Sequence, residues 1–202
     1  MSIQTQEEQV LALANSTSLL RARDLAALSL PTIILSRLVQ DGRLRRLTRG
    51  VYARPDRALS EHISLVEVAI RVPKGVICLL SALRIHGLGT QAPHQVWLAI
   101  PQNSPTPRVE RPSLRAVRMS GAALTEGVES TQIDGMDVPV FSAAKTIADC
   151  FKYRNKIGID VAMEALRDGW AQRKISMDEL SHYADIDRVS NVMRPYLESL
   201  TA

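Results

Sequence analysis

The stretch RDLAALSLPTIILSRLVQDGRLRRLTRGVYARP, residues 23–55, decides how the first quarter of the chain folds. It begins inside a short helix expected around Ala22–Leu28, and the compact turn Ser29-Leu30-Pro31 follows. We expect Ser29 to cap a second helix, because a serine hydroxyl accepts hydrogen bonds from the N–H groups of a first turn and proline is tolerated there. This second helix should run from Pro31 to Gln40 and end at Asp41-Gly42, where glycine readily adopts the left-handed conformation.

The Pro31–Gln40 helix should have two contrasting faces. One face is apolar and is expected to pack on the core; it holds Ile34, Leu35, Leu38 and Val39. The other is polar and could read base edges or phosphates in a major groove; it holds Thr32, Ser36 and Arg37, with Gln40 nearer the helix end. The alternative is a solvated polar face without a partner. Ile33 could touch a thymine methyl group, although an apolar residue in a helix more often packs internally.

A basic hairpin is expected directly after this helix, over residues 43–55. Strand-compatible residues flank Thr48-Arg49-Gly50, a turn in which glycine can take a positive φ. Its arginines are candidate phosphate contacts: Arg43, Arg45, Arg46 and Arg49. Arg49 lies in the turn and is positioned to enter a minor groove. The competing interpretation is a charged hairpin exposed only to water. Together with a first helix over residues 5–14, this pattern predicts a winged helix-turn-helix.

The charge distribution supports a nucleic-acid partner for this region. Residues 1–57 contain nine arginines against five acidic residues, whereas residues 58–202 contain sixteen basic and sixteen acidic residues. A local excess of positive charge on a helix-turn-helix favours binding to a phosphate backbone. We therefore expect an α+β protein, with a winged helix-turn-helix over residues 1–57 and a mixed helix/sheet domain over residues 58–202.

The second domain should alternate helices with short strands. Helices are expected at residues 60–72, 81–86, 142–153 and 160–171, and over 177–202 with a break near Asp185–Asp187. Strands are expected at 95–101 and 114–120, separated by a proline-rich exposed loop over 102–113. Asp134-Gly135 predicts a hairpin between two further strands.

No catalytic or metal-binding pattern emerges from the sequence. His62, His86 and His94 have no metal-ligand spacing, and Asp134 is already explained by its turn, so we predict no metal, no cofactor and no enzymatic activity. Lys145, Lys152, Arg154 and Lys156 gather around one helix end, where cations are favourable for local reasons; a second binding surface is the minority interpretation. An enzyme with a DNA-binding module is therefore disfavoured.

The expected location is the cytoplasm. Cys78 and Cys150 both lie in apolar sequence surroundings, which fits two buried thiols in a reducing compartment better than a disulfide. The N-terminal segment MSIQTQEEQV is polar and does not have the pattern of a signal peptide, and no apolar run has the length of a membrane span. We expect no membrane partner.

The sequence resembles the AbiEi family of antitoxins and transcriptional regulators from type IV toxin–antitoxin systems. The resemblance lies in three blocks in the expected order, residues 23–55, 77–101 and 138–168. It implies an N-terminal winged helix that binds an inverted-repeat operator in double-stranded DNA and represses its own operon. It also implies a C-terminal domain that counters a nucleotidyltransferase-type toxin without a tight complex. The alternative is a ligand-responsive winged-helix regulator with no toxin partner.

Overall fold

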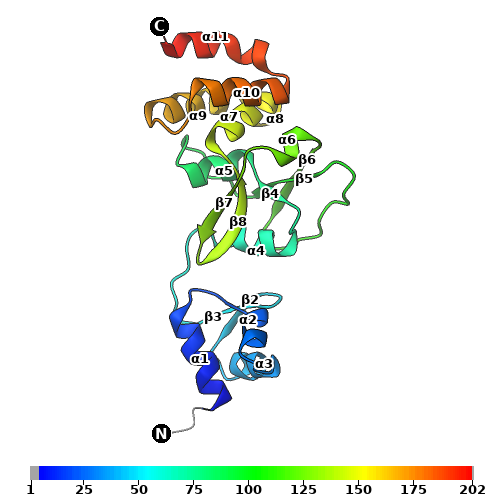
Figure 1. Cartoon of the computed structure of the whole chain (residues 1–202), viewed down its shortest axis with the longest axis vertical. Helices are drawn as coiled ribbons and strands as arrows, with labels where there is room; N and C mark the ends of the chain where they lie inside the picture. Colours follow the sequence, from blue (N-terminus) through cyan, green and yellow to red (C-terminus); the bar gives the residue numbers. More distant parts are fainter. Residues whose placement is uncertain (1–4, 202) are drawn as a thin grey trace. The chain divides into compact units, whose positions relative to one another are not determined.

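The chain folds into two compact units (Figure 1). The structure, a computed structural model, describes residues 5–201; residues 1–4 and Ala202, which fall at the ends of the expected first domain and last helix, lie outside the described residues. The first unit extends to Glu67 and includes Gln132–Asp137, and the remainder of the chain forms the second. The boundary expected at residue 57 falls in the stretch between the last strand of the first unit and the helix that follows.

The first unit combines three helices with a three-stranded sheet. Its elements are α1 (Gln6–Ser16), β1 (Leu20–Arg21), α2 (Ala22–Ala27), α3 (Ile33–Gln40), β2 (Arg45–Thr48) and β3 (Val51–Ala53). The strand order is β1-β3-β2, and both pairings are antiparallel. The two-residue strand β1 has no recognisable sequence pattern, because it exists only through its pairing of Leu20 with Tyr52.

Local sequence explains where α1 begins. Thr5 and Glu8 form a reciprocal capping box, in which each side chain accepts a hydrogen bond from the other residue's backbone N–H. Val10, Leu11 and Ala14 are buried on one face, as the spacing predicts. The helix continues beyond the expected end at residue 14 to Ser16.

The turn between α2 and α3 differs from the sequence-based expectation. Ser29 has a φ of 54°, so it lies in the left-handed region and does not cap α3; the prediction of a Ser29 cap is wrong. An N-cap requires an extended backbone that aims its side chain at the first turn. The helix begins at Ile33 instead of Pro31, and Thr32 in the N-cap position forms no side-chain capping bond.

The core of the first unit joins all three helices to the hairpin. Its buried members include Val10, Leu20, Leu25, Ile34, Leu35, Leu38, Leu44 and Tyr52. Val39 is only partly buried at the edge of this cluster. The β2–β3 hairpin turns at Gly50, whose φ of 76° is the conformation that glycine was expected to supply.

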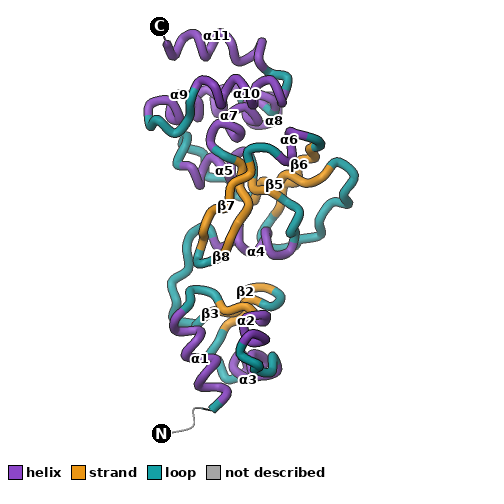
Figure 2. Tube along the Cα trace, viewed as in Figure 1, coloured by secondary structure: helices purple, strands orange, loops and turns teal. Residues whose placement is uncertain are grey.

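The second unit contains most of a five-stranded mixed sheet and its helices (Figure 2). The strand order is β6-β5-β4-β8-β7, with β4 antiparallel to β5 and parallel to β8, and β5 parallel to β6. The strands are β4 (Val76–Ile77), β5 (Val96–Pro101), β6 (Leu114–Met119), β7 (Val128–Ile133) and β8 (Met136–Phe141). The helices are α4 (Ile63–Arg71), which begins in the first unit, α5 (Leu79–His86), α6 (Ala122–Thr125), α7 (Ala143–Lys152), α8 (Arg154–Ile157), α9 (Ile159–Ala171), α10 (Met177–Asp187) and α11 (Ser190–Thr201).

One face of this sheet builds the main core of the second unit. Trp97, Ala99, Val117 and Met119 alternate along β5 and β6 and are buried in one cluster with side chains of α5, α7, α9 and α10. Helix α7 is the centre of the helical layer, because nine of its ten residues are buried. Ser142 caps this helix, as expected, by accepting a hydrogen bond from the backbone N–H of Lys145.

Most elements of the second unit match the predicted ones, with shifted ends. The strand β4 and the short helices α6 and α8 were not expected, because each has four residues or fewer. The last helical region breaks directly after Asp187, at Arg188 with a φ of 57°, which confirms the break expected near Asp185–Asp187. Among the described residues, no helix has both the length and the apolar character to cross a membrane.

Candidate nucleic-acid interface

Helix α3 separates a buried apolar face from an exposed polar one. Ile34, Leu35 and Leu38 are at most 3% exposed. Thr32, Ser36 and Arg37, the three residues predicted to contact DNA from this helix, are all exposed. The predicted division of the helix is therefore present, and the three polar side chains lie where a ligand outside the protein can reach them.

An exposed apolar residue begins the same helix. Ile33 is 56% exposed, so its side chain is not part of the core as the packing interpretation would require. Leu28, at the end of α2, is 53% exposed. Single apolar side chains are often exposed on protein surfaces, so only the position of Ile33 on the polar side of α3 makes it a candidate contact. The sequence favours internal packing of Ile33 over contact with a thymine methyl group. Its exposure in the structure favours the contact instead.

The hairpin arginines differ in how firmly they are held. Arg45 Nη2 donates to the carbonyl oxygen of Arg57 at 3.0 Å, and Arg46 Nε donates to that of Thr48 at 3.4 Å. Arg49 is exposed in the turn, and within the described part of the chain its side chain forms no hydrogen bond or ion pair. Arg49 is therefore the hairpin arginine with the greatest freedom to reach a ligand.

Arg43 links α3 to the hairpin. Its backbone N–H donates to the carbonyl oxygen of Leu38, and so does that of Leu44. Its guanidinium lies 3.8 Å from Glu7 Oε2, with both side chains well exposed. Such an exposed, long ion pair contributes little to stability and can open for another anion. All seven predicted contact residues thus lie on one continuous segment, 32–49, of one compact unit.

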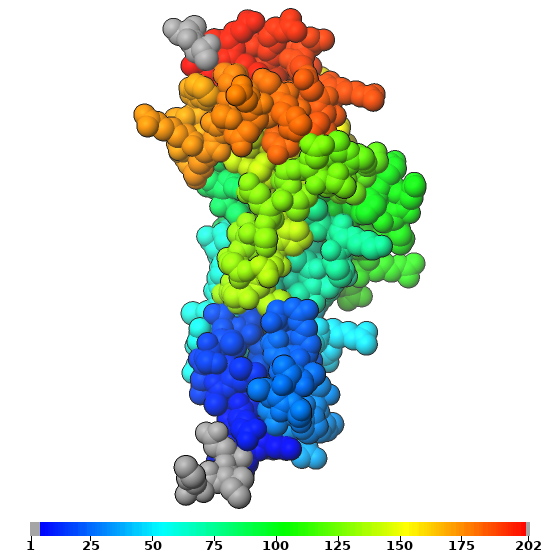
Figure 3. Space-filling model, in the orientation of Figure 1, coloured from blue at the N-terminus to red at the C-terminus, as the bar shows by residue number. Residues whose placement is uncertain are grey.

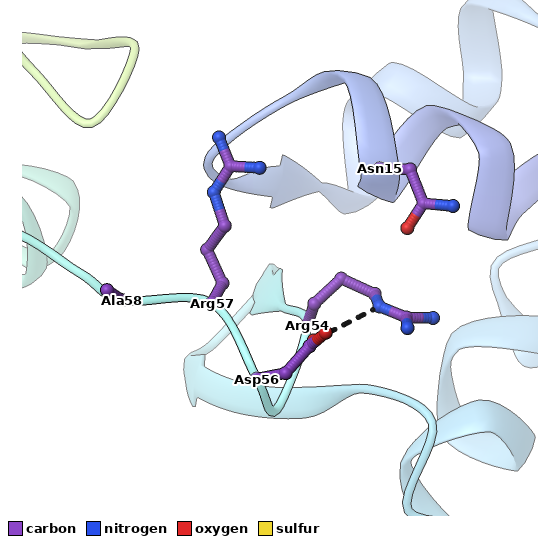
Figure 4. A pocket seen from close by; sticks show the side chains of 5 residues that line it. All are labelled: Asn15, Arg54, Asp56, Arg57 and Ala58. Atoms are coloured by element: carbon purple, nitrogen blue, oxygen red, sulfur yellow. Dashed lines mark ion pairs between the residues drawn. The ribbon is translucent and has the colours of Figure 1, made fainter.

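A second arginine cluster of the first unit surrounds a hollow of about 260 Å³, lined by Asn15, Arg54, Asp56, Arg57 and Ala58 (Figure 4). Arg54 pairs with Asp56 at 3.4 Å, and Arg57 Nη2 donates to Ser18 Oγ at 3.1 Å. The guanidinium groups of Arg54 and Arg57 point in different directions in Figure 4. They do not converge on one point of the hollow, so this cluster is a weaker candidate site than the 32–49 segment.

The cationic cluster predicted around the end of α7 is different in the structure. Lys145 is fully buried and paired with Asp149 at 2.5 Å and with Asp187 at 3.2 Å, while Lys152 pairs with Asp187 at 3.0 Å. Lys145 is therefore an internal charge with carboxylate partners. Lys152, which is 32% exposed in the last turn of α7, is a cation at the helix end as the local interpretation expects, and Arg154 Nη1 donates to the carbonyl oxygen of Phe151 at 2.8 Å. The signal available in the sequence was the spacing of Lys145 and Asp149, one helical turn apart in an apolar helix.

Burial controls the ionisation of this cluster. It raises the pKa of the Asp149 carboxyl well above its usual 3.8; Lys145 opposes the shift and Asp187 adds to it. Asp149 Oδ2 is buried without a hydrogen-bond partner among the described residues. Burial also raises the pKa of the Cys78 and Cys150 thiols, so these buried cysteines are poor nucleophiles.

The histidines serve separate local contacts. His86 Nε2 lies 2.7 Å from the carbonyl oxygen of Phe141, and His62 lies 3.7 Å from Glu61. Within residues 5–201, no three His, Cys, Asp or Glu side chains gather as a metal site would require.

Comparisons with known proteins connect the first unit to a family. No curated protein matches the chain. Its fold is similar to that in the crystal structure of the RV2827C protein from Mycobacterium tuberculosis, with 18% identity, a TM-score of 0.61, and coverage of 91% of this chain and 72% of that one. Residues 8–55, which run from α1 to the end of the hairpin, match the family model described as "Transcriptional regulator, AbiEi antitoxin". The predicted resemblance to the AbiEi family of antitoxins and transcriptional regulators is therefore confirmed over residues 8–55.

Proposed function

We propose that the chain is a cytoplasmic DNA-binding antitoxin that represses its own toxin–antitoxin operon. The single observation that carries this proposal is the division of α3, whose apolar side is in the core while Thr32, Ser36 and Arg37 are exposed. The order of helices and strands in the first unit, with α3 followed by a hairpin, supports the proposal because a winged helix-turn-helix has the same order. In such modules the second helix of the pair enters the major groove.

Each part of the 32–49 segment has its own task in this proposal. Thr32, Ser36 and Arg37 read base edges or fix the helix against phosphates, because the groove admits one helix and these side chains point away from its core side. Arg43, Arg45, Arg46 and Arg49 contact the phosphate backbone, and Arg49 at the turn does so beside a minor groove. The operator is an inverted repeat in double-stranded DNA, a geometry that pairs two copies of the protein.

The second unit is assigned the antitoxin role. The support is the AbiEi match of the N-terminal region, whose family description includes antitoxin. We assign a nucleotidyltransferase-type enzyme as the toxin, countered through function and not through a tight complex. The buried state of Cys78 and Cys150 supports a reducing, cytoplasmic location.

A footprint of the full chain on the DNA upstream of its own reading frame tests the repressor role. Protection of an inverted repeat, lost when Ser36 and Arg37 are both replaced by alanine, is the expected result. Protection that persists after the double substitution would show that residues outside α3 make the DNA contact. Coexpression with the neighbouring reading frame tests the antitoxin role: growth arrest by that gene alone should be relieved by the full chain and also by the Ser36/Arg37 variant.

A further inference from the structure

The neutral total charge of residues 58–202 conceals a strongly basic segment. Residues 68–125 carry seven cations, Arg71, Lys74, Arg84, Arg108, Arg111, Arg115 and Arg118, against the single acid Glu110, a net charge of +6. Residues 126–202 carry nine cations and thirteen acids, a net charge of −4, which cancels most of this excess. The second unit is therefore polarised along its sequence, and its positive part needs an explanation of its own.

Two of these cations line an apolar hollow of about 380 Å³. The hollow lies between the end of α4, the end of β5 and the loop that follows β5, all within the second unit. Its lining residues are Arg71, Val72, Pro73, Lys74, Ile100, Pro101, Ser104, Pro105 and Pro107. In Figure 3 this loop, in green, lies on the outside of the unit.

Two arginines, one of them the lining residue Arg71, are hydrogen-bonded to the same loop. Arg118 Nη2 donates to Thr106 Oγ1 at 3.0 Å, and Arg71 Nη1 donates to the carbonyl oxygen of Arg111 at 2.5 Å. Lys74, Arg111 and Arg118 are exposed, and no carboxylate in residues 5–201 forms an ion pair with any of them. The hollow is thus an apolar depression with the exposed cation Lys74 in its lining and the exposed cation Arg118 bound to its loop.

Four of the nine lining residues are prolines, Pro73, Pro101, Pro105 and Pro107. Proline fixes the backbone φ angle and carries no N–H that must be satisfied, so these walls lose little conformational entropy when a ligand binds. A binding surface that is already ordered does not spend interaction energy on ordering itself. The hollow therefore has the rigidity expected of a site for an inserted side chain.

We propose that this hollow, defined by the nine lining residues, docks an acidic amphipathic segment of a partner protein. One large apolar side chain of the segment enters the hollow, while neighbouring Asp or Glu residues face Lys74 and Arg118. Apolar anchors in a pocket supply affinity, and complementary charges at the rim supply orientation and speed of association. Nucleic acid fits less well, because the lining contains no aromatic ring for base stacking and a phosphate backbone makes no use of an apolar hollow.

The test first selects peptides that bind the full chain. It then removes the positive charge of the rim and the space of the hollow in separate variants. Short random peptides displayed on phage are panned on the immobilised protein, and the enriched peptide is synthesised with a fluorescent label for anisotropy titrations. Lys74→Glu reverses a rim charge, and Ser104→Trp fills the hollow. Arg167→Glu, an exposed arginine of α9 outside the hollow, makes the same charge change as the matched control. Folding of each variant is checked by circular dichroism, and Pro105→Glu replaces Ser104→Trp if that variant does not fold.

The expected peptides contain a large apolar residue flanked by acidic residues. Their affinity should fall at least about fivefold in Lys74→Glu and in Ser104→Trp and stay unchanged in Arg167→Glu. A smaller loss in either hollow variant, an enriched sequence without acidic residues, or no enrichment overturns the proposal. So does a fivefold loss of affinity for mixed-sequence DNA or RNA in Lys74→Glu, which would identify a nucleic-acid surface. None of these outcomes depends on whether α3 binds DNA.

Discussion

Lys145 and Asp187 are 42 residues apart in the sequence, yet Lys145 Nζ lies 3.2 Å from Asp187 Oδ2 and neither side chain is exposed. Asp187 also accepts from Lys152, so one carboxylate at the end of α10 holds two lysines of α7. A buried charge is tolerated only with a partner, because leaving water is costly for an ion. The ion pairs therefore fix how α10 docks on α7.

Replacing Asp187 by asparagine should destabilise the second unit by about 3–5 kcal/mol, because Lys145 would remain buried with a weakened counter-charge. Urea denaturation followed by tryptophan fluorescence measures this directly, since Trp97 and Trp170 are the only two tryptophans and both lie in the second unit. Asp178→Asn, at an exposed carboxylate of the same helix, is the control and should cost less than about 1 kcal/mol. Equal effects of the two substitutions would contradict a structural role for the buried pair.

Asp149 should make the stability of the second unit fall as pH rises above its unfolded-state pKa of about 3.8. Burial raises the folded-state pKa, so between the two values the folded protein holds a proton that the unfolded chain has released. Its contribution to stability is thus greatest in acid and is lost as pH rises towards the folded-state pKa. Asp149→Asn removes this titration, and the difference in unfolding free energy between the two proteins should shift in favour of the variant with rising pH. If the difference in unfolding free energy between the two proteins does not change with pH, the proposed titration of Asp149 is wrong.

Arg37→Ala should relax operator preference more than it weakens binding to random DNA. A bidentate base contact contributes about 1–3 kcal/mol of discrimination, or roughly tenfold to a hundredfold in relative affinity. Binding curves on operator and random duplexes at one salt concentration give the ratio. If the affinities for operator and random DNA fall by the same factor, Arg37 contacts a phosphate. Thr32 and Ser36 then remain the candidates for contacts with base edges.

Arg49→Ala should lower the salt dependence of DNA binding. Each phosphate contact that is removed reduces the slope of log K against log salt by about 0.9 on B-DNA. Arg45→Ala is a useful comparison, because its guanidinium is already bound to the Arg57 carbonyl and should contribute a smaller change. A loss confined to operator DNA in Arg49→Ala would instead indicate reading of a minor groove.

Ile33→Ala should weaken operator binding several-fold with little change in stability. A side chain that is 56% exposed contributes little to the core, so the free energy of unfolding should change by less than about 0.5 kcal/mol. Contact with a thymine methyl group explains the loss on DNA, and replacing that thymine with uracil should abolish the difference between the two proteins. Leu28→Ala, at a similarly exposed residue outside α3, is the matched control and should bind the operator normally.

The elements predicted from sequence were those with strong local signals. Thr5 and Glu8 mark the start of α1, Gly50 marks the hairpin turn, and Asp134-Gly135 marks the turn between β7 and β8; each depends on side chains or φ angles within a few residues. Ser29 misled because its identity permits a cap, whereas it occupies the left-handed position that ends α2. The backbone N–H groups of Ser29 and Leu30 donate to the carbonyl oxygens of Ala26 and Leu25, which is a local helix C-terminal motif. β1 was missed because two residues form a strand only through a distant partner.

The sequence by itself determined the α+β class, the core face of α3, the basic hairpin and the resemblance of the first region to AbiEi regulators, because periodicity, turn chemistry and local charge are properties of neighbouring residues. Only the tertiary structure decided that Lys145 is a buried partner of Asp187, that Ile33 is exposed, and that Lys74 stands at the rim of an apolar hollow. Burial and pairing depend on residues far apart in the chain that meet when helices and strands pack. The physical reason is that desolvation and Coulomb energies are set by the surroundings of a side chain in space, which a linear pattern does not contain.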